Sequence, residues 1–259
     1  MSDKAPPATF SPDHDGATVR PSPNFGERRD GARPALIVLH YTGMATGEAA
    51  EDWLCAPESE VSSHYIVHED GRIVQMVREE NRAWHAGRSF WKGITDVNSA
   101  SVGIEIVNGG HDFGLPDFPP VQIEAVIVLT EGIMARQAIG SHEVIAHSDV
   151  APGRKRDPGE RFPWKALAGY GVALHVEPVP VGGGRFLAPG DTGEPVAALQ
   201  SMLALYGFDA KSDGVFGELT RVQVEAFQRR HRPAQVDGIA DMSTIEMLNR
   251  LLRLYPSFA

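Results

Sequence analysis

The chain has 259 residues, of which 42% are hydrophobic, so it can form one large domain or two modest ones. Its formal net charge of -10 argues against non-specific binding to nucleic acid. No stretch approaches the roughly 20 apolar residues of a membrane span, and Cys55, the one cysteine, excludes an intrachain disulfide and a multi-cysteine metal site.

The N-terminal stretch, residues 1–33, is rich in Pro, Asp, Gly and Arg, which indicates a mostly irregular arm. Met1 to Pro7 contain no basic segment followed by an apolar one, so no secretory signal is visible. We therefore expect a cytoplasmic location, with the periplasm or cell envelope as the alternative.

The first apolar run, residues 35–39, predicts a buried strand that ends at His40. A polar side chain at the tip of a buried strand, where a loop begins, is a common position for a functional residue. A short helix is expected over residues 48–54.

Further strands are predicted by β-prone runs in the next part of the chain. Residues 62–68 and 72–77 flank Glu69-Asp70-Gly71, and Asp-Gly between two such runs indicates a hairpin. Residues 101–107 predict another strand, with Val102, Ile104 and Ile106 on one face and Glu105 on the other, together with Gly103 and Val107. A buried acid needs a partner or a function. The alternative is an edge strand with Glu105 in water, and the local pattern leaves both open.

A long amphipathic run predicts a helix over residues 121–137, opened by Pro119-Pro120 and stopped near Gly140. Residues 144–146 predict a short strand, and a last helix of about two turns is expected from Phe162-Pro163-Trp164. Strands and helices interleave, so we expect an α/β fold in which helices flank a mixed central β-sheet.

The composition changes near the middle of the chain, where prolines stand beside a glycine run. We expect a catalytic domain over residues 34–172, a linker over 173–190, and a small three-helix domain over 191–259. Two loops of the last segment repeat one pattern, because Asp213-Gly214 and Asp237-Gly238 each stand seven residues before a threonine.

The loop at residues 147–159 brings a candidate metal site. It contains His147 and Asp157, and a hydrolytic zinc site needs about three His, Asp or Glu ligands with one position left open. His40, at the end of the first strand, is the best candidate for the third ligand.

Five motifs, found in family order over roughly residues 33–170, resemble the zinc-dependent N-acetylmuramoyl-L-alanine amidases of the type-2 class. They are Leu39-His40-Tyr41-Thr42, Ser62-Ser63-His64-Tyr65, Ala83-Trp84-His85-Ala86-Gly87, Ser101-Val102-Gly103-Ile104-Glu105, and residues 146–155 with Asp157-Pro158-Gly159. The C-terminal segment resembles the small peptidoglycan-binding domain attached to many cell-wall hydrolases, through its Asp-Gly-x-Phe-Gly loop and the helix with Phe227-Gln228.

The resemblance implies that His40, His147 and Asp157 bind Zn²⁺ and that Glu105 and Lys155 assist catalysis. The implied reaction is hydrolysis of the amide between the lactyl group of (anhydro-)N-acetylmuramic acid and L-alanine of the stem peptide. Peptidoglycan or muropeptide fragments would be the partners, with no role for nucleic acid.

Four residues near these motifs are candidates for holding the substrate. Arg154 suits a carboxylate of the stem peptide, because a guanidinium binds carboxylates through two parallel hydrogen bonds. His85, Trp84 and Asn108 are candidates for lining the cleft, with structural roles as the alternatives. For His64 a structural role is expected.

Two other functions compete with the amidase. One is a protein of the same fold that recognises peptidoglycan or muropeptides without cleaving them, a class that usually lacks one of the metal ligands. The other is a metal-stabilised scaffold whose C-terminal module carries the function.

Overall fold

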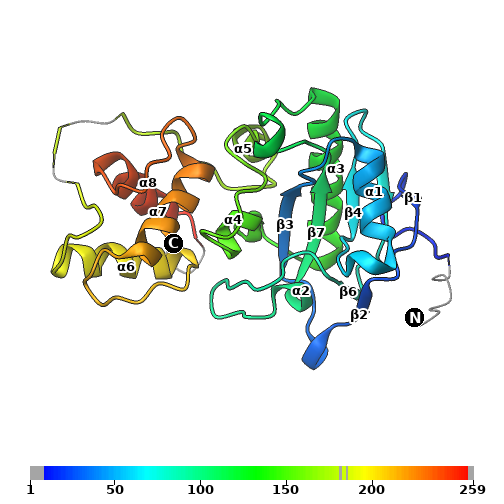
Figure 1. Cartoon of the computed structure of the whole chain (residues 1–259), viewed down its shortest axis with the longest axis horizontal. Helices are drawn as coiled ribbons and strands as arrows, with labels where there is room; N and C mark the ends of the chain where they lie inside the picture. Colours follow the sequence, from blue (N-terminus) through cyan, green and yellow to red (C-terminus); the bar gives the residue numbers. More distant parts are fainter. Residues whose placement is uncertain (1–8, 181–182, 185, 256–259) are drawn as a thin grey trace.

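A computed structural model describes residues 9–180, 183–184 and 186–255 of the chain (Figure 1). Residues 1–8 of the expected arm, residues 181, 182 and 185 of the expected linker, and residues 256–259 lie outside these ranges. An α/β unit built on one sheet lies beside a unit of three helices (Figure 1).

A six-stranded mixed sheet forms the centre of the α/β unit, which confirms the expected fold class. In spatial order its strands are β1 (Thr18–Val19), β5 (Ile73–Gln75), β4 (Tyr65–Val67), β7 (Ser101–Ile106), β3 (Leu36–Tyr41) and β8 (Val144–Ala146). Strand β3 is parallel to β7 and β8, and β4 is parallel to β7 but antiparallel to β5. The β4–β5 pair confirms the hairpin predicted around Asp70-Gly71.

The two longest strands, β3 and β7, lie inside the sheet, where continuous apolar runs fit strands that are covered on both faces. On one face, Leu39 and Ile104 pack with helix α3 (Pro120–Gln137) and helix α5 (Trp164–Gly169). Because β7 has a neighbour on each side, the edge-strand alternative for Glu105 is wrong.

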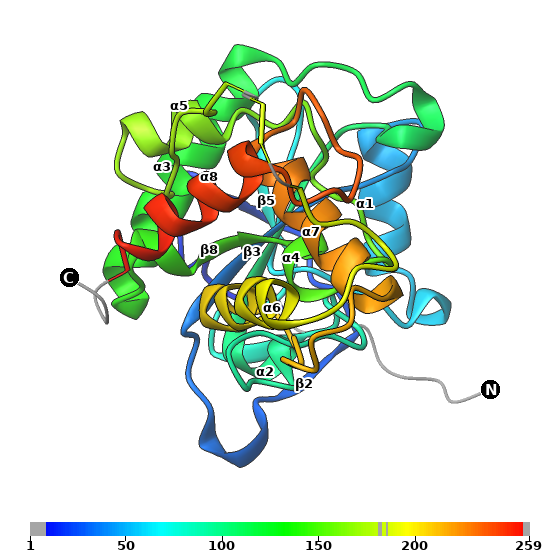
Figure 2. The same ribbon diagram turned by 90° about the vertical axis from the view of Figure 1, so that its left-hand side faces the viewer.

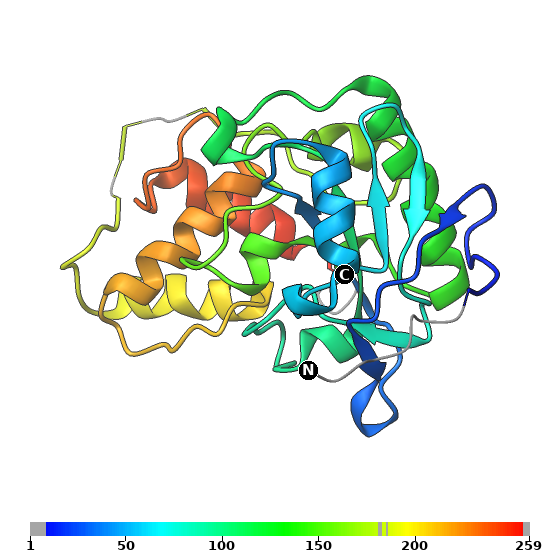
Figure 3. The same ribbon diagram turned by 45° about the vertical axis from the view of Figure 1, so that its right-hand side comes forward.

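Part of the opposite face is covered by helix α1 (Gly47–Cys55), which runs beside the hairpin strands (Figure 3). Its Ala50 and Leu54 pack against Ile66 and Val74. The helix begins after Thr46, whose hydroxyl accepts a hydrogen bond from the Ala49 N–H (3.1 Å), as expected of an N-terminal cap.

Several short elements were not visible in the sequence. Strand β2 (Phe25–Glu27) pairs with β6 (Asn81–Ala83), and helix α2 (Val97–Ala100) precedes β7. The stretch from residue 147, expected to be irregular, begins with one helical turn, α4 (His147–Val150).

Helix α3 ends at Gln137, as predicted, but Gly140 does not provide its stop. Ala138, rather than Gly140, takes the left-handed conformation that closes it, with φ 55°. The N–H of Ile139 bonds back to the carbonyl of Met134 (3.0 Å), which satisfies an end carbonyl of the helix and offsets the cost of a non-glycine residue at positive φ.

The C-terminal unit contains helices α6 (Glu194–Tyr206), α7 (Glu218–His231) and α8 (Met242–Leu252). A buried glutamine explains each repeated loop. The Gln200 amide donates to Asp213, the Val215 carbonyl and Thr220, and it accepts from the Gly214 N–H. Gln228 makes the equivalent bonds to Asp237, the Ile239 carbonyl, Thr244 and the Gly238 N–H.

The two units share one core. A continuous apolar cluster joins Leu36, Val38 and Ile145 of the sheet to Leu199 of α6, Phe227 of α7 and Leu248 of α8. Figure 2 looks onto the three helices, with the sheet behind them. Within the described ranges, no helix combines the length and the apolar character needed to cross a bilayer.

We expect Gln228→Leu to destabilise the protein by about 2 kcal/mol, because it leaves the buried Gly238 N–H and the Ile239 carbonyl without their partner. Urea unfolding measures the loss. Gln235→Leu is the matched control, because Gln235 is exposed and bonds only the Asp237 side chain. Equal stability of the two variants would contradict this role of Gln228.

Candidate metal centre

The three residues proposed as metal ligands meet at one edge of the sheet. His40 follows the apolar part of β3, and His147 follows β8, the parallel neighbour of β3. The His40 Nδ1 atom lies 2.9 Å from His147 Nδ1 and 3.0 Å from Asp157 Oδ2, and the last two atoms are 2.8 Å apart. All three residues are buried.

Hydrogen bonds behind the two imidazoles determine which nitrogen carries a proton. The Ser101 hydroxyl donates to the Val97 carbonyl (2.6 Å), so Ser101 Oγ accepts from His85 Nε2 (3.1 Å). His85 Nδ1 then accepts from His40 Nε2 (3.0 Å). His147 Nε2 donates to the Ala86 carbonyl (3.1 Å). In both ligand histidines, the proton is therefore on Nε2 and Nδ1 presents a lone pair.

The charge state of the site agrees with this assignment. Burial, reinforced by His147, lowers the pKa of His40 to about 4, so its imidazole is neutral near pH 7. Burial alone would raise the pKa of Asp157, but His147 and His40 hold it well below its ordinary value. With the imidazole protons on Nε2, both Nδ1 lone pairs and the Asp157 carboxylate point at one place, which is repulsive unless a cation lies among them. The donor set and its open side fit a divalent metal ion.

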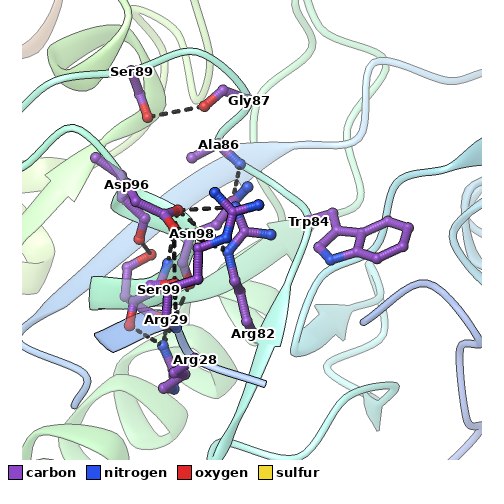
Figure 4. A network of polar contacts seen from close by, with 12 residues as sticks. Arg28, Arg29, Arg82, Trp84, Ala86, Gly87, Ser89, Asp96, Asn98 and Ser99 are labelled. Atoms are coloured by element: carbon purple, nitrogen blue, oxygen red, sulfur yellow. Dashed lines mark hydrogen bonds and ion pairs between the residues drawn. The ribbon is translucent and has the colours of Figure 1, made fainter. Parts of the chain in front are cut away.

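A polar network positions His85 and Ala86, which hydrogen-bond the two ligand histidines through the His85 ring and the Ala86 carbonyl (Figure 4). The Asn98 side-chain oxygen accepts from the backbone N–H groups of His85 (3.1 Å) and Ala86 (2.8 Å). Asp96, beside it, accepts from the Arg82 guanidinium and from the Ser99 hydroxyl. This network fixes the His85 ring and the Ala86 carbonyl behind the two ligand histidines.

The metal ligands open onto a cleft of about 440 Å³. The residues that line it are His40, Tyr41, Thr42, Gly43, Met44, Ala50, Trp53, Leu54, Val61, Ser62, Trp84, His85, Glu105, Asp112, His147, Arg154, Lys155, Arg156 and Asp157. Every predicted metal ligand, both predicted catalytic residues and three of the four predicted substrate-binding residues are in this set.

Glu105 lies next to His40 because the two residues are register partners on β7 and β3. Its Oε2 atom is buried and has no hydrogen-bond partner among the described residues. Burial raises the pKa of the Glu105 carboxyl well above its ordinary value, Asp157 adds to the rise, and Lys155 partly offsets it. A carboxyl group with such a pKa beside a metal site is suited to general acid–base catalysis.

The remaining predicted site residues differ in their surroundings. The Arg154 Nη2 group donates to the carbonyls of Ala86 (2.6 Å) and Arg88 (2.7 Å), which fixes the guanidinium at the cleft. Asn108 does not line the cleft; its side chain donates to the Pro116 carbonyl and accepts from the Gly110 N–H. These contacts favour the structural alternative for Asn108.

His64 has the contacts of a structural residue. Its Nδ1 atom accepts from the Gly103 N–H (2.9 Å), and its Nε2 atom bonds the Asn81 carbonyl (3.1 Å).

Sequence reasoning missed Trp53, which is 47% exposed and reaches the cleft from α1. A tryptophan beside the acidic pair Glu51-Asp52 on a short helix is the signal that could have identified it.

Two known families match this chain, one over each unit. The family described as N-acetylmuramoyl-L-alanine amidase matches residues 30–160, which include the metal ligands, Glu105 and Lys155. A second family, described as a peptidoglycan binding domain, matches residues 192–248, the segment of helices α6 to α8.

Individual relatives extend over both units. The N-acetylmuramoyl-L-alanine amidase AmiD of Escherichia coli is 38% identical over 237 residues, which are 86% of this chain and 84% of that protein. A solved structure of AmiD with anhydro-N-acetylmuramic acid-L-Ala-D-gamma-Glu-L-Lys superposes with a TM-score of 0.73 at 35% identity, covering 90% of this chain and 98% of AmiD. AmpDh3 of Pseudomonas aeruginosa, bound to an anhydromuramic pentapeptide, gives a TM-score of 0.68 at 28% identity, with 89% and 93% coverage.

The buried Glu105 carboxyl predicts a pH-dependent stability. A glutamate has a pKa near 4.5 in the unfolded chain. When folding raises that pKa, the carboxyl group destabilises the fold at every pH above the unfolded-state pKa, because the folded protein disfavours the ionised form. Metal-free Glu105→Gln should therefore be more stable than the wild-type protein at pH 7, by about 1 kcal/mol, and equally stable at pH 4.

Urea unfolding at the two pH values measures this difference. Glu124→Gln, an exposed glutamate of α3, should show no such pH dependence. A Glu105→Gln variant that is less stable than the wild-type protein at pH 7 would show that the carboxylate stabilises the fold and does not strain it.

Proposed function

The chain belongs to the N-acetylmuramoyl-L-alanine amidase family, and we propose that its cleft hydrolyses the amide between the lactyl group of N-acetylmuramic acid, in ordinary or anhydro form, and L-alanine of the stem peptide. The observation that carries the proposal is the convergence of His40, His147 and Asp157 below a cleft that also holds Glu105 and Lys155. Cleavage of this bond releases peptides that begin with L-alanine.

We propose that His40, His147 and Asp157 hold one Zn²⁺. Two imidazole nitrogens and one carboxylate oxygen, with one side open to the cleft, form a ligand set typical of catalytic zinc. Bound zinc would supply Lewis acidity for the amide carbonyl and for the attacking water.

The chain's own groups then perform the proton transfers and stabilise charge. Glu105 accepts the proton of the attacking water and returns it to the amine that leaves, a task that suits its raised pKa. Lys155 lines the same cleft and places a positive charge close enough to lower the pKa of Glu105, so it is positioned to stabilise the oxyanion that develops on the carbonyl.

Arg154, Trp84 and His85 are proposed to contact the substrate. Carbonyl contacts hold the Arg154 guanidinium in place through Nη2 alone, so its other donors are available for a carboxylate of the stem peptide. Trp84 offers an apolar wall of the cleft. His85 also bonds His40, so its effect on the substrate is coupled to its effect on the metal site.

The C-terminal unit is proposed to contact peptidoglycan, on the strength of its family match. Such a module would favour action on the cell wall over action on soluble fragments, and therefore the envelope over the cytoplasm. The predicted location thus depends on which substrate the protein cleaves.

Zinc-loaded protein, incubated separately with intact sacculi and with soluble anhydro-muropeptides, tests the proposal when the products are read by mass spectrometry. Release of peptides that begin with L-alanine from either substrate supports the amidase. Cleavage of sacculi supports a wall enzyme, and cleavage of soluble fragments alone supports a recycling enzyme. Cleavage of neither substrate by zinc-loaded protein would support the non-catalytic recognition protein.

Metal binding and catalysis should separate in two variants. Glu105→Gln should retain one zinc per chain and lose at least about 100-fold in kcat, because it lacks the general base. His147→Ala should lose the zinc itself, because only two ligands remain. Metal analysis of the purified variants and the rate of peptide release measure both effects. His142→Ala, a histidine outside the cleft, is the control. Normal turnover in Glu105→Gln would exclude the assigned role.

A further inference from the structure

We infer that Arg229 and Arg230, neighbours on helix α7 of the C-terminal unit, are positioning residues for the metal centre. This inference rests on the proposed function, and it gives the C-terminal unit a second role besides contact with peptidoglycan. The two arginines reach, by separate routes, residues that stand beside all three metal ligands.

Arg230 holds the turn that begins with His147. Its Nη1 group donates to Asp149 Oδ2 (2.6 Å), and its Nη2 group donates to the Val144 carbonyl (2.9 Å) of β8. Asp149 Oδ2 also accepts from the Ala146 N–H (2.9 Å), directly before His147. The ion pair is buried, with side chains 3% and 0% exposed. The guanidinium also lies 4.2 Å from the centre of the Trp164 ring.

Arg229 reaches sequence neighbours of the other two ligands through a chain of side chains. Its Nε group donates to Glu160 Oε1 (2.8 Å), and Glu160 is three residues after Asp157. Glu160 Oε2 accepts from His111 Nε2 (2.7 Å), and His111 Nδ1 accepts from the Tyr41 hydroxyl (3.0 Å). Tyr41 directly follows His40 and lines the cleft.

Helix α7 also contacts the middle of the ligand-bearing segment. Gly153, between His147 and Asp157, has φ +76°, and a Cβ atom there would lie 3.1 Å from the Val222 side chain of α7. The segment from residue 147 to residue 160 is therefore in contact with the C-terminal unit at its start, its middle and its end.

Adhesion between the two units does not require these charges, because a continuous apolar cluster already joins them. A buried ion pair gains little net stability, since its attraction is offset by the cost of removing both charges from water. The Arg230–Asp149 pair instead fixes the segment of residues 147–160 in one conformation. Outer partners of metal ligands typically change metal affinity 10- to 100-fold when they are removed.

The test compares full-length Arg229→Met, Glu160→Gln and their double variant. The zinc dissociation constant is measured by competition with a chelator, and kcat and KM are measured on soluble muropeptide. Each single variant should raise the zinc dissociation constant about tenfold and lower kcat, and the double variant should be no worse than either. KM should stay within twofold of the wild-type value. A loss of folded protein would also lower the apparent kcat without changing KM, so circular dichroism is used to confirm that each variant is folded.

Arg221→Met is the matched control, because Arg221 is also on α7 but pairs with Glu218 and Glu225 of the same helix. Its zinc dissociation constant should stay within twofold of wild type. Arg230→Lys keeps the charge but loses the planar fork that reaches both Asp149 and the Val144 carbonyl, so its dissociation constant should also rise.

Folded Arg229→Met and Arg230→Lys with wild-type zinc affinity and kcat would overturn the inference, even if their binding to sacculi changed. Failure of the proposed function has a different signature, in which the zinc-loaded wild-type protein itself cleaves nothing. In that case the zinc dissociation constants of the variants still decide whether α7 positions the metal ligands.

Discussion

The protein's chemistry depends on three unprotonated donor atoms held within about 3 Å of one another in a buried place. Without a cation these donor atoms repel one another, so other contacts of the fold must keep them in place. Two features do so: the parallel pairing of β3 with β8, which brings His40 and His147 to one edge, and the hydrogen bonds that place both imidazole protons on Nε2.

The two faces of the sheet have different structural roles. One face packs against α3 and α5 and forms an ordinary apolar core. The other face has three regions. Helix α1 covers the first, the second forms the cleft, and the third packs against the C-terminal helices in the shared core. The metal-ligand segment is therefore bounded by both units, and the C-terminal unit packs as part of the enzyme's interior, in addition to its resemblance to a wall-binding module.

Patterns of apolar residues were sufficient to predict strands β3, β4, β5, β7 and β8, the main helices and the mixed sheet, but not the short strands β1, β2 and β6. The sequence could not decide the surroundings of Glu105, because strand order is a property of the whole sheet and not of the local run. Ser101, Asn98 and the Ala86 carbonyl were missed because small polar residues and backbone groups have no distinctive pattern. No sequence pattern singled out Arg229 and Arg230, and only the packing of the two units shows that Arg230 is buried.

Diffraction from crystals of the zinc-loaded protein, recorded on both sides of the zinc absorption edge, tests the central claim most directly. We predict one strong anomalous peak per chain, bonded to His40 Nδ1, His147 Nδ1 and Asp157 Oδ2, with its open side toward Glu105. A peak bonded to the Nε2 atoms would contradict the assigned proton positions. Zinc bound elsewhere, with this site vacant at saturating metal, would contradict the account as a whole.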